Sequence, residues 1–66
     1  MEIKVNGESR SVAEGETIRT LLTALRLDPA RVAVELDREI VKPPVWGETA
    51  LRPGAELEIV QFVGGG

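Results

Sequence analysis

Only one stretch of the chain has the periodicity of an amphipathic helix, and this feature constrains the fold most. Apolar residues recur there at intervals of three and four positions, which places them on one helical face: Ile18, Leu21, Leu22 and Leu25. Thr17 can cap this helix by accepting a hydrogen bond from the amide of Arg19 or Thr20. Asp28-Pro29 predicts that the helix ends near Leu27. A single helix with one apolar face must pack on a sheet, because neither layer can bury its own apolar surface.

The segment before the helix predicts a β-hairpin. Residues 1–5 alternate apolar with charged side chains, which is the period of a half-buried strand. Asn6-Gly7 then provides the positive φ angles that a two-residue hairpin turn requires. Residues 8–12 form the returning strand, and their polar side chains place it near an edge of the sheet.

The segment after the helix predicts two more strands, at residues 31–37 and 56–63. The stretch 38–54 between them is predicted to be irregular, because Pro43-Pro44 excludes a central strand. The strand at 56–63 is the most continuously apolar, which suits a central position. We therefore expect an α+β fold. Trp46 is expected to cover one end of its core, with a partner hot spot as the alternative.

Composition excludes several classes of function. A chain of 66 residues forms one domain, 1–66, with a single small core. It has no Cys and no His, so we expect no disulfide and no metal site. The net charge of −3 argues against nucleic-acid binding. No apolar run approaches the roughly 20 residues that cross a membrane. No signal peptide is visible, so we expect a cytoplasmic protein.

Five segments together resemble the thiamine-biosynthesis sulfur carrier family: IKVNGE, ETIRTLLTAL, VAVELDREIV, WGETALRPGAELEIV and VGGG. The resemblance covers the whole chain in the right order. It implies the ubiquitin-like β-grasp fold, a mixed sheet with one main helix packed on one face and its first and last strands parallel at the centre. Residues 64–66 would be a flexible C-terminal glycine tail. The sequence departs from the family at Thr20, where relatives often have an acidic residue that completes a capping box.

The resemblance also implies a reaction at the glycine tail. A ThiF-like adenylyltransferase would use ATP to adenylate the carboxylate of Gly66, and a sulfur donor protein would convert the adenylate into a thiocarboxylate. A ThiG-like thiazole synthase would then take the sulfur for the thiazole ring. Gly64 and Gly65 have no Cβ, so they would fit a narrow channel in a partner's site. The protein would be a carrier and substrate with no bound cofactor of its own, not an enzyme.

The last strand predicts a surface for these partners. One set of its side chains is expected to face the core: Leu57, Ile59 and Val63. The other set is expected to face away from the helix: Glu56, Glu58, Val60 and Phe62. Val60 and Phe62 would then form an apolar contact patch beside the tail, and Glu56 and Glu58 could meet basic residues of a partner. A twist or bulge that turns Phe62 inward is the alternative.

Three other functions remain open. The small subunit of molybdopterin synthase shares the fold, the tail and the activation chemistry, although those chains tend to be longer and to end in Gly-Gly after a small residue such as Ala. A ubiquitin-like modifier would join its tail to lysines. A regulatory β-grasp module would leave the tail idle.

Overall fold

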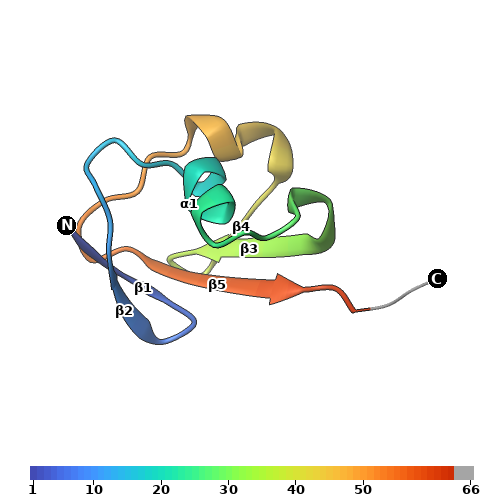
Figure 1. The fold of residues 1–66 in the computed structure, drawn as a ribbon, viewed down its shortest axis with the longest axis horizontal. Helices are drawn as coiled ribbons and strands as arrows, with labels where there is room; N and C mark the ends of the chain where they lie inside the picture. The colour runs from blue at the N-terminus through green and yellow to red at the C-terminus, as the bar shows by residue number, and fades with distance from the viewer. Residues whose placement is uncertain (64–66) are drawn as a thin grey trace.

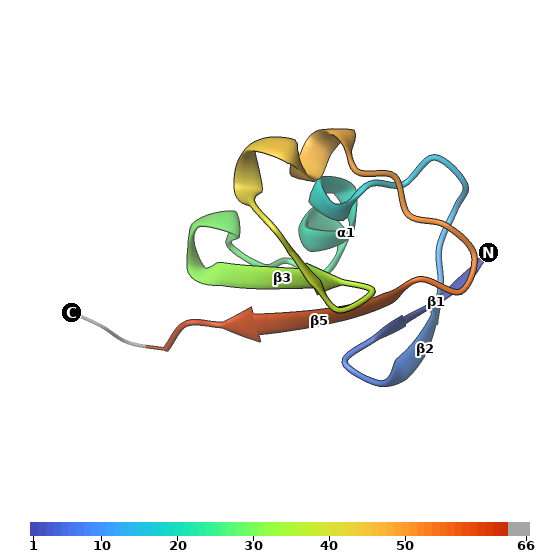
Figure 2. The same ribbon diagram turned by 180° about the vertical axis from the view of Figure 1, so that it is seen from behind.

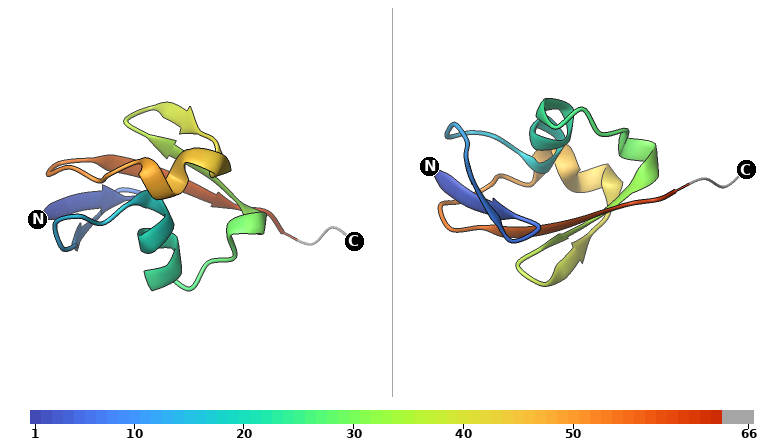
Figure 3. Two further views of the ribbon diagram at one scale, coloured as in Figure 1. Left: turned by 90° about the horizontal axis from the view of Figure 1, so that it is seen from above. Right: turned by 60° about the horizontal axis from the view of Figure 1, so that its bottom comes forward.

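The chain folds into a five-stranded mixed sheet with one α-helix on one face (Figure 1). The structure, a computed structural model, describes residues 1–63. The strands are β1 (Glu2–Val5), β2 (Glu8–Ser11), β3 (Val32–Leu36), β4 (Glu39–Val41) and β5 (Glu56–Gln61), in the order β2-β1-β5-β3-β4. β1 and β5 are parallel, and the other neighbours are antiparallel. This confirms the predicted β-grasp arrangement, with β5 between the two hairpins (Figure 3).

The helix α1 (Ile18–Ala24) and the 3-10 helix η2 (Pro43–Glu48) lie together over the same face of the sheet (Figures 1 and 2). Between these layers lies the apolar core: Ile3, Ile18, Leu21, Leu22, Val32, Val34, Trp46, Leu51, Ala55, Leu57 and Ile59. Trp46 is 1% exposed, and its indole Nε1 donates a hydrogen bond to the carbonyl of Val41 at 2.7 Å. The prediction that Trp46 belongs to the core is therefore confirmed.

The start of α1 confirms the predicted cap and explains the departure at Thr20. The side-chain oxygen of Thr17 accepts a hydrogen bond from the Thr20 amide at 3.2 Å. The Thr20 hydroxyl in turn accepts one from the Thr17 amide at 2.8 Å. The capping box is therefore closed by a threonine hydroxyl in the place of a carboxylate.

The end of α1 comes earlier than the sequence predicts. The helix ends at Ala24 with Leu25 as its C-cap, not near Leu27. Arg26, which a helix ending near Leu27 would include, lies beyond the helix with φ 60°. The Arg26 amide donates to the Thr23 carbonyl, and the Leu27 amide donates to the Leu22 carbonyl, both at 3.0 Å. This is the hydrogen-bond pattern of a Schellman motif, whose left-handed position usually holds glycine.

We therefore expect Arg26→Gly to raise the free energy of unfolding by about 1 kcal/mol, because it removes the cost of a left-handed L-residue. Arg19→Gly is the matched control, since the same change inside α1 should lower that free energy by about 1 kcal/mol. Urea unfolding of both variants measures the difference. A loss of stability in Arg26→Gly would contradict the assigned C-cap.

The stretch 38–54 is more regular than predicted. It contains β4 and η2, and a second 3-10 helix, η1 (Pro29–Arg31), precedes β3. β4 follows β3 through a two-residue turn in which Asp37 has φ 50° and Arg38 has φ 73°. Asn-Gly and Asp-Gly are the usual sequences of such turns. Since this one contains no glycine, the residue pattern does not reveal the second hairpin.

Candidate functional site

The predicted site residues lie along β5 and just beyond it. Along β5 the side chains alternate as expected, with Leu57 and Ile59 buried in the core and Glu56, Glu58 and Val60 exposed. The alternation places the exposed set on the sheet face opposite α1. We name this face of the sheet the outer face. The predicted phase of the strand is therefore confirmed.

Val63 was predicted to face the core, and this is wrong. Its side chain is 94% exposed. The physical reason is that β5 ends at Gln61, so the period of the strand does not extend to Val63. Just after β5, the Phe62 amide donates a main-chain hydrogen bond to the carbonyl of Arg31, the residue before β3, at 2.7 Å.

Phe62 is 54% exposed, so the alternative that a bulge turns it into the core is wrong. Its side chain lines an open, mainly apolar groove of about 530 Å³ together with Pro29, Ala33, Ile40 and Pro43. This groove lies where η1, β3 and β4 meet the end of β5. A half-exposed aromatic ring in such a groove offers apolar contact area to a partner.

The register of the sheet adds two residues that sequence reasoning missed. Val60 lies directly opposite Ala33 on β3, and Ile40 on β4 lies opposite Glu35. Residues directly opposite one another share a face, so Ala33 and Ile40 lie on the outer face with Val60. We name Ala33, Ile40, Val60 and Phe62 the outer patch. Ile40 is 74% exposed and Val60 is 60% exposed. Sequence reasoning missed Ile40 because it did not predict β4, and β4 was not predicted because its hairpin turn has no glycine.

The predicted carboxylates lie beside the outer patch. Glu58 lies opposite Glu35 on β3, and Glu56 lies opposite Lys4 on β1. Within residues 1–63, the one ion pair joins Arg31 to Asp28 at 3.8 Å. Glu56 and Glu58 therefore form no ion pair within this part of the chain. Like charges directly opposite each other on adjacent strands destabilise a sheet. The outer face therefore presents unpaired negative charge next to apolar side chains.

The three glycines predicted to carry the chemistry, Gly64, Gly65 and Gly66, lie outside the described residues. In the described part, no group of three or more acidic side chains is placed to hold a metal ion. No helix within residues 1–63 is long and apolar enough to cross a membrane.

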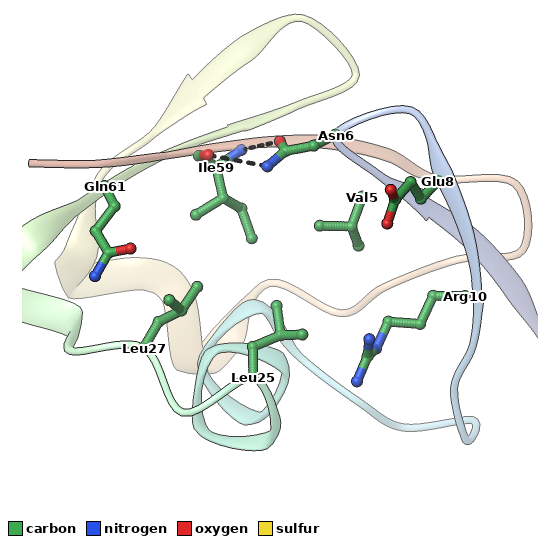
Figure 4. A pocket seen from close by; sticks show the side chains of 8 residues that line it. All are labelled: Val5, Asn6, Glu8, Arg10, Leu25, Leu27, Ile59 and Gln61. Carbon is green, nitrogen blue, oxygen red and sulfur yellow. Dashed lines mark hydrogen bonds between the residues drawn. The ribbon is translucent and has the colours of Figure 1, made fainter.

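A second hollow, of about 390 Å³, lies on the helix side of the sheet (Figure 4). Val5, Leu25 and Ile59 contribute apolar side chains to it, and Arg10 and Gln61 contribute polar ones. Of the predicted site residues within 1–63, none lines this hollow. The predicted partner residues and the second hollow therefore occupy different parts of the surface.

Comparison with known proteins gives consistent matches over the whole chain. The model of the ThiS family matches residues 3–66. The chain is 41% identical over 66 residues to the thiazole synthase of Paramagnetospirillum magneticum, but it spans only 20% of that protein. It is 27% identical to the sulfur carrier protein ThiS of Escherichia coli, with both chains covered completely. The crystal structure of the thiamine biosynthesis protein ThiS from Geobacter metallireducens superposes with a TM-score of 0.85 at 33% identity and full coverage of both chains.

Proposed function

Because this chain belongs to the ThiS family, we propose that it is a sulfur carrier protein in thiamine biosynthesis. The observation that carries the proposal is the likeness to the solved ThiS protein from Geobacter metallireducens, with a TM-score of 0.85 at 33% identity over both whole chains. The role is that of a substrate passed between enzymes, not of a catalyst. It needs an accessible tail and a surface that enzymes can bind, not a deep catalytic pocket.

The proposed chemistry takes place at Gly66. An α-carboxyl group is ionised at neutral pH, so one of its oxygens can attack the α-phosphorus of ATP in the site of a ThiF-like adenylyltransferase. Pyrophosphate leaves, and the carboxylate becomes an acyl-adenylate. A sulfur nucleophile from a donor protein then attacks the acyl carbon and displaces AMP. With a persulfide as the nucleophile, the product is an acyl disulfide. A thiol then attacks the donor's sulfur, forms a disulfide with it and releases the thiocarboxylate, so that one oxygen of Gly66 has been replaced by sulfur.

Gly64 and Gly65 suit this chemistry because the tail must enter the active site of another protein. Without Cβ atoms they can pass through a narrow channel and adopt backbone angles closed to other residues. Three residues extend by at most about 10 Å. The adenylyltransferase must therefore bind the body of the carrier close to the end of β5 to bring Gly66 into its site.

We assign this contact to the outer patch and to Glu56 and Glu58. Of the five large apolar side chains exposed in the described residues, Ile40, Val60, Phe62 and Val63 belong to the outer face or to the end of β5. Such clustering is typical of a protein interface. The neighbouring carboxylates favour a partner with basic residues at the rim of its surface.

A ThiG-like thiazole synthase is the proposed second partner. The Paramagnetospirillum magneticum protein that matches this chain over one fifth of its length is itself named a thiazole synthase. A segment similar to this chain therefore forms part of a thiazole synthase polypeptide in that organism. This supports a sulfur transfer in which the carrier and the thiazole-forming enzyme work next to each other.

Phe62→Asp should weaken binding to the adenylyltransferase by about 2 kcal/mol, roughly 30-fold in Kd, because it places a charge at an apolar anchor. The free energy of unfolding should change by less than about 1 kcal/mol, since the side chain is half exposed. The matched control is Val45→Asp, an exposed apolar residue on η2, away from the outer face. Calorimetric titration and urea unfolding give the two quantities. Equal loss of affinity in both variants would contradict the assigned surface.

The proposed pathway is tested by offering the sulfur-loaded carrier to two acceptors. Thiazole synthase with its small substrates should consume the sulfur, and the large subunit of molybdopterin synthase with its precursor should not. The opposite result would assign the chain to the molybdopterin pathway. Conjugation of Gly66 to lysines, without either transfer, would make it a protein modifier.

A further inference from the structure

The side chain of Asn6 extends the pairing between β1 and β5. The two strands are in register only at Lys4 with Glu56 and at Val5 with Leu57. The main-chain amide of Asn6 donates to the Leu57 carbonyl at 2.8 Å. Beyond this point the side-chain carboxamide of Asn6 pairs with β5 in the place of main-chain groups. Its Oδ1 accepts a hydrogen bond from the Ile59 amide at 2.7 Å, and its Nδ2 donates one to the Ile59 carbonyl at 3.2 Å (Figure 4). We name these two bonds the Asn6 clamp.

The same residue stands in a reactive sequence. Asn6 precedes Gly7 in the exposed turn between β1 and β2, where φ is 51° at Asn6 and 83° at Gly7. A Cβ built on Gly7 would meet no atom within 4 Å. Gly7 has no side chain, and the space beside its Cα is open, so the approach to its nitrogen is not blocked from that side. A carbonyl carbon that reaches this nitrogen can be attacked with little steric hindrance.

We propose that Asn6 is a deamidation site that the Asn6 clamp protects in the folded protein. In the reaction the Gly7 nitrogen attacks Cγ of Asn6, a C–N bond forms, and the side-chain nitrogen leaves as ammonia with the proton from the Gly7 amide. The product is a cyclic succinimide. Water then adds to either carbonyl of the ring and opens it to aspartate or isoaspartate. The only co-reactant is water, which reaches this exposed turn.

The clamp controls this reaction because it holds the carboxamide against Ile59. Cγ of Asn6 can approach the Gly7 nitrogen freely only after the carboxamide rotates, which breaks both hydrogen bonds of the clamp. The reaction in the folded chain is therefore limited to the fraction of molecules in which the clamp is open.

The products cannot rebuild the clamp. Aspartate can still accept from the Ile59 amide, but its second oxygen is an acceptor that would face the Ile59 carbonyl, where the amide had a donor. Isoaspartate adds a methylene to the main chain of a two-residue turn and so disturbs the register of the hairpin. Either product weakens the hold of β1 on β5, the strand that leads into the C-terminal glycines. The inference rests on the fold and does not depend on the carrier function.

The first test compares ammonia loss in the folded chain and in the same chain unfolded in concentrated urea, at mildly alkaline pH. Asn6 is the only asparagine of the chain, so intact mass followed by peptide mapping gives a clear measurement. We expect loss at Asn6 in urea, and loss at least tenfold slower in the folded chain. Equal rates would show that the clamp does not protect the site. No conversion in urea would show that Asn6 is not a deamidation site.

The second test measures what the modification does to the fold. Asn6→Asp reproduces one product. Gln61→Glu is the matched control, because it makes the same change from amide to carboxylate in the same hollow but does not touch the hydrogen bonds of the Asn6 clamp. We expect Asn6→Asp to lower the melting temperature by several degrees and Gln61→Glu to leave it nearly unchanged. Equal shifts would show that added charge, not loss of the clamp, causes the effect.

Discussion

Removal of Gly65 and Gly66 is expected to abolish activation of the protein while leaving its melting temperature unchanged. Within residues 1–63, the buried core lies between Ile3 and Ile59, and glycine has no side chain to bury, so we expect the deletion to leave this core intact. Activation should fail because the chain would then end at Gly64, and its carboxylate would stop about 7 Å short of its normal reach. ATP–pyrophosphate exchange with the cognate adenylyltransferase measures activation, and thermal unfolding measures stability.

A chain extended by one alanine after Gly66 complements the deletion. It keeps all three glycines but moves the carboxylate outward and places a Cβ at the reacting residue. We expect this chain also to lose exchange, while its binding to the adenylyltransferase persists through the outer patch. Undiminished exchange by the truncated chain would remove the tail from the mechanism.

Trp46→Ala is expected to destabilise the domain by about 3–5 kcal/mol. A domain of this length has a total free energy of unfolding of roughly 3–10 kcal/mol, so the variant should lose about a third or more of it and would be unfolded at the lower end of that range. The substitution leaves a cavity between η2 and the sheet, and it deprives the Val41 carbonyl of its donor. Urea unfolding followed by circular dichroism measures the loss.

Trp46→Phe separates the two causes. This variant keeps an aromatic ring in the core but has no N–H to donate to the Val41 carbonyl. It should therefore lower the free energy of unfolding by less than the alanine variant does. A loss below about 1 kcal/mol for Trp46→Ala would contradict the assignment of this residue to the core. In that case a role at the partner interface, the alternative left open by the sequence, would have to be reconsidered.

The sequence predicts the parts of the fold whose signal is local. The spacing of Ile18, Leu21 and Leu22 identifies the buried face of α1, and Thr17 marks its start. Asn6-Gly7 predicts the first hairpin because Asn-Gly is a common sequence of two-residue hairpin turns. The alternation along β5 places Val60 correctly on the outer face. Each of these signals depends on residues that are close together in the chain.

The parts that the sequence did not predict depend on unusual backbone angles or on distant contacts. Arg26, Asp37 and Arg38 adopt positive φ angles without being glycine, so the end of α1 and the second hairpin carried no visible signal. The Asn6 clamp joins residues 53 positions apart, and no local pattern reports such a contact. Ile40 joins the outer patch only through the pairing of β4 with β3.

The intact mass of the carrier after activation tests the central claim most directly. The protein is incubated with ATP, the cognate adenylyltransferase and a sulfur source, and its C-terminal peptide is then analysed. The proposed function predicts that one oxygen of Gly66 is replaced by sulfur in the free protein, and that omission of ATP prevents this. The chain contains only two lysines, Lys4 and Lys42, so few sites on the carrier itself would compete for the activated tail. Covalent conjugates of Gly66 with other proteins, and no thiocarboxylate, would contradict the carrier function.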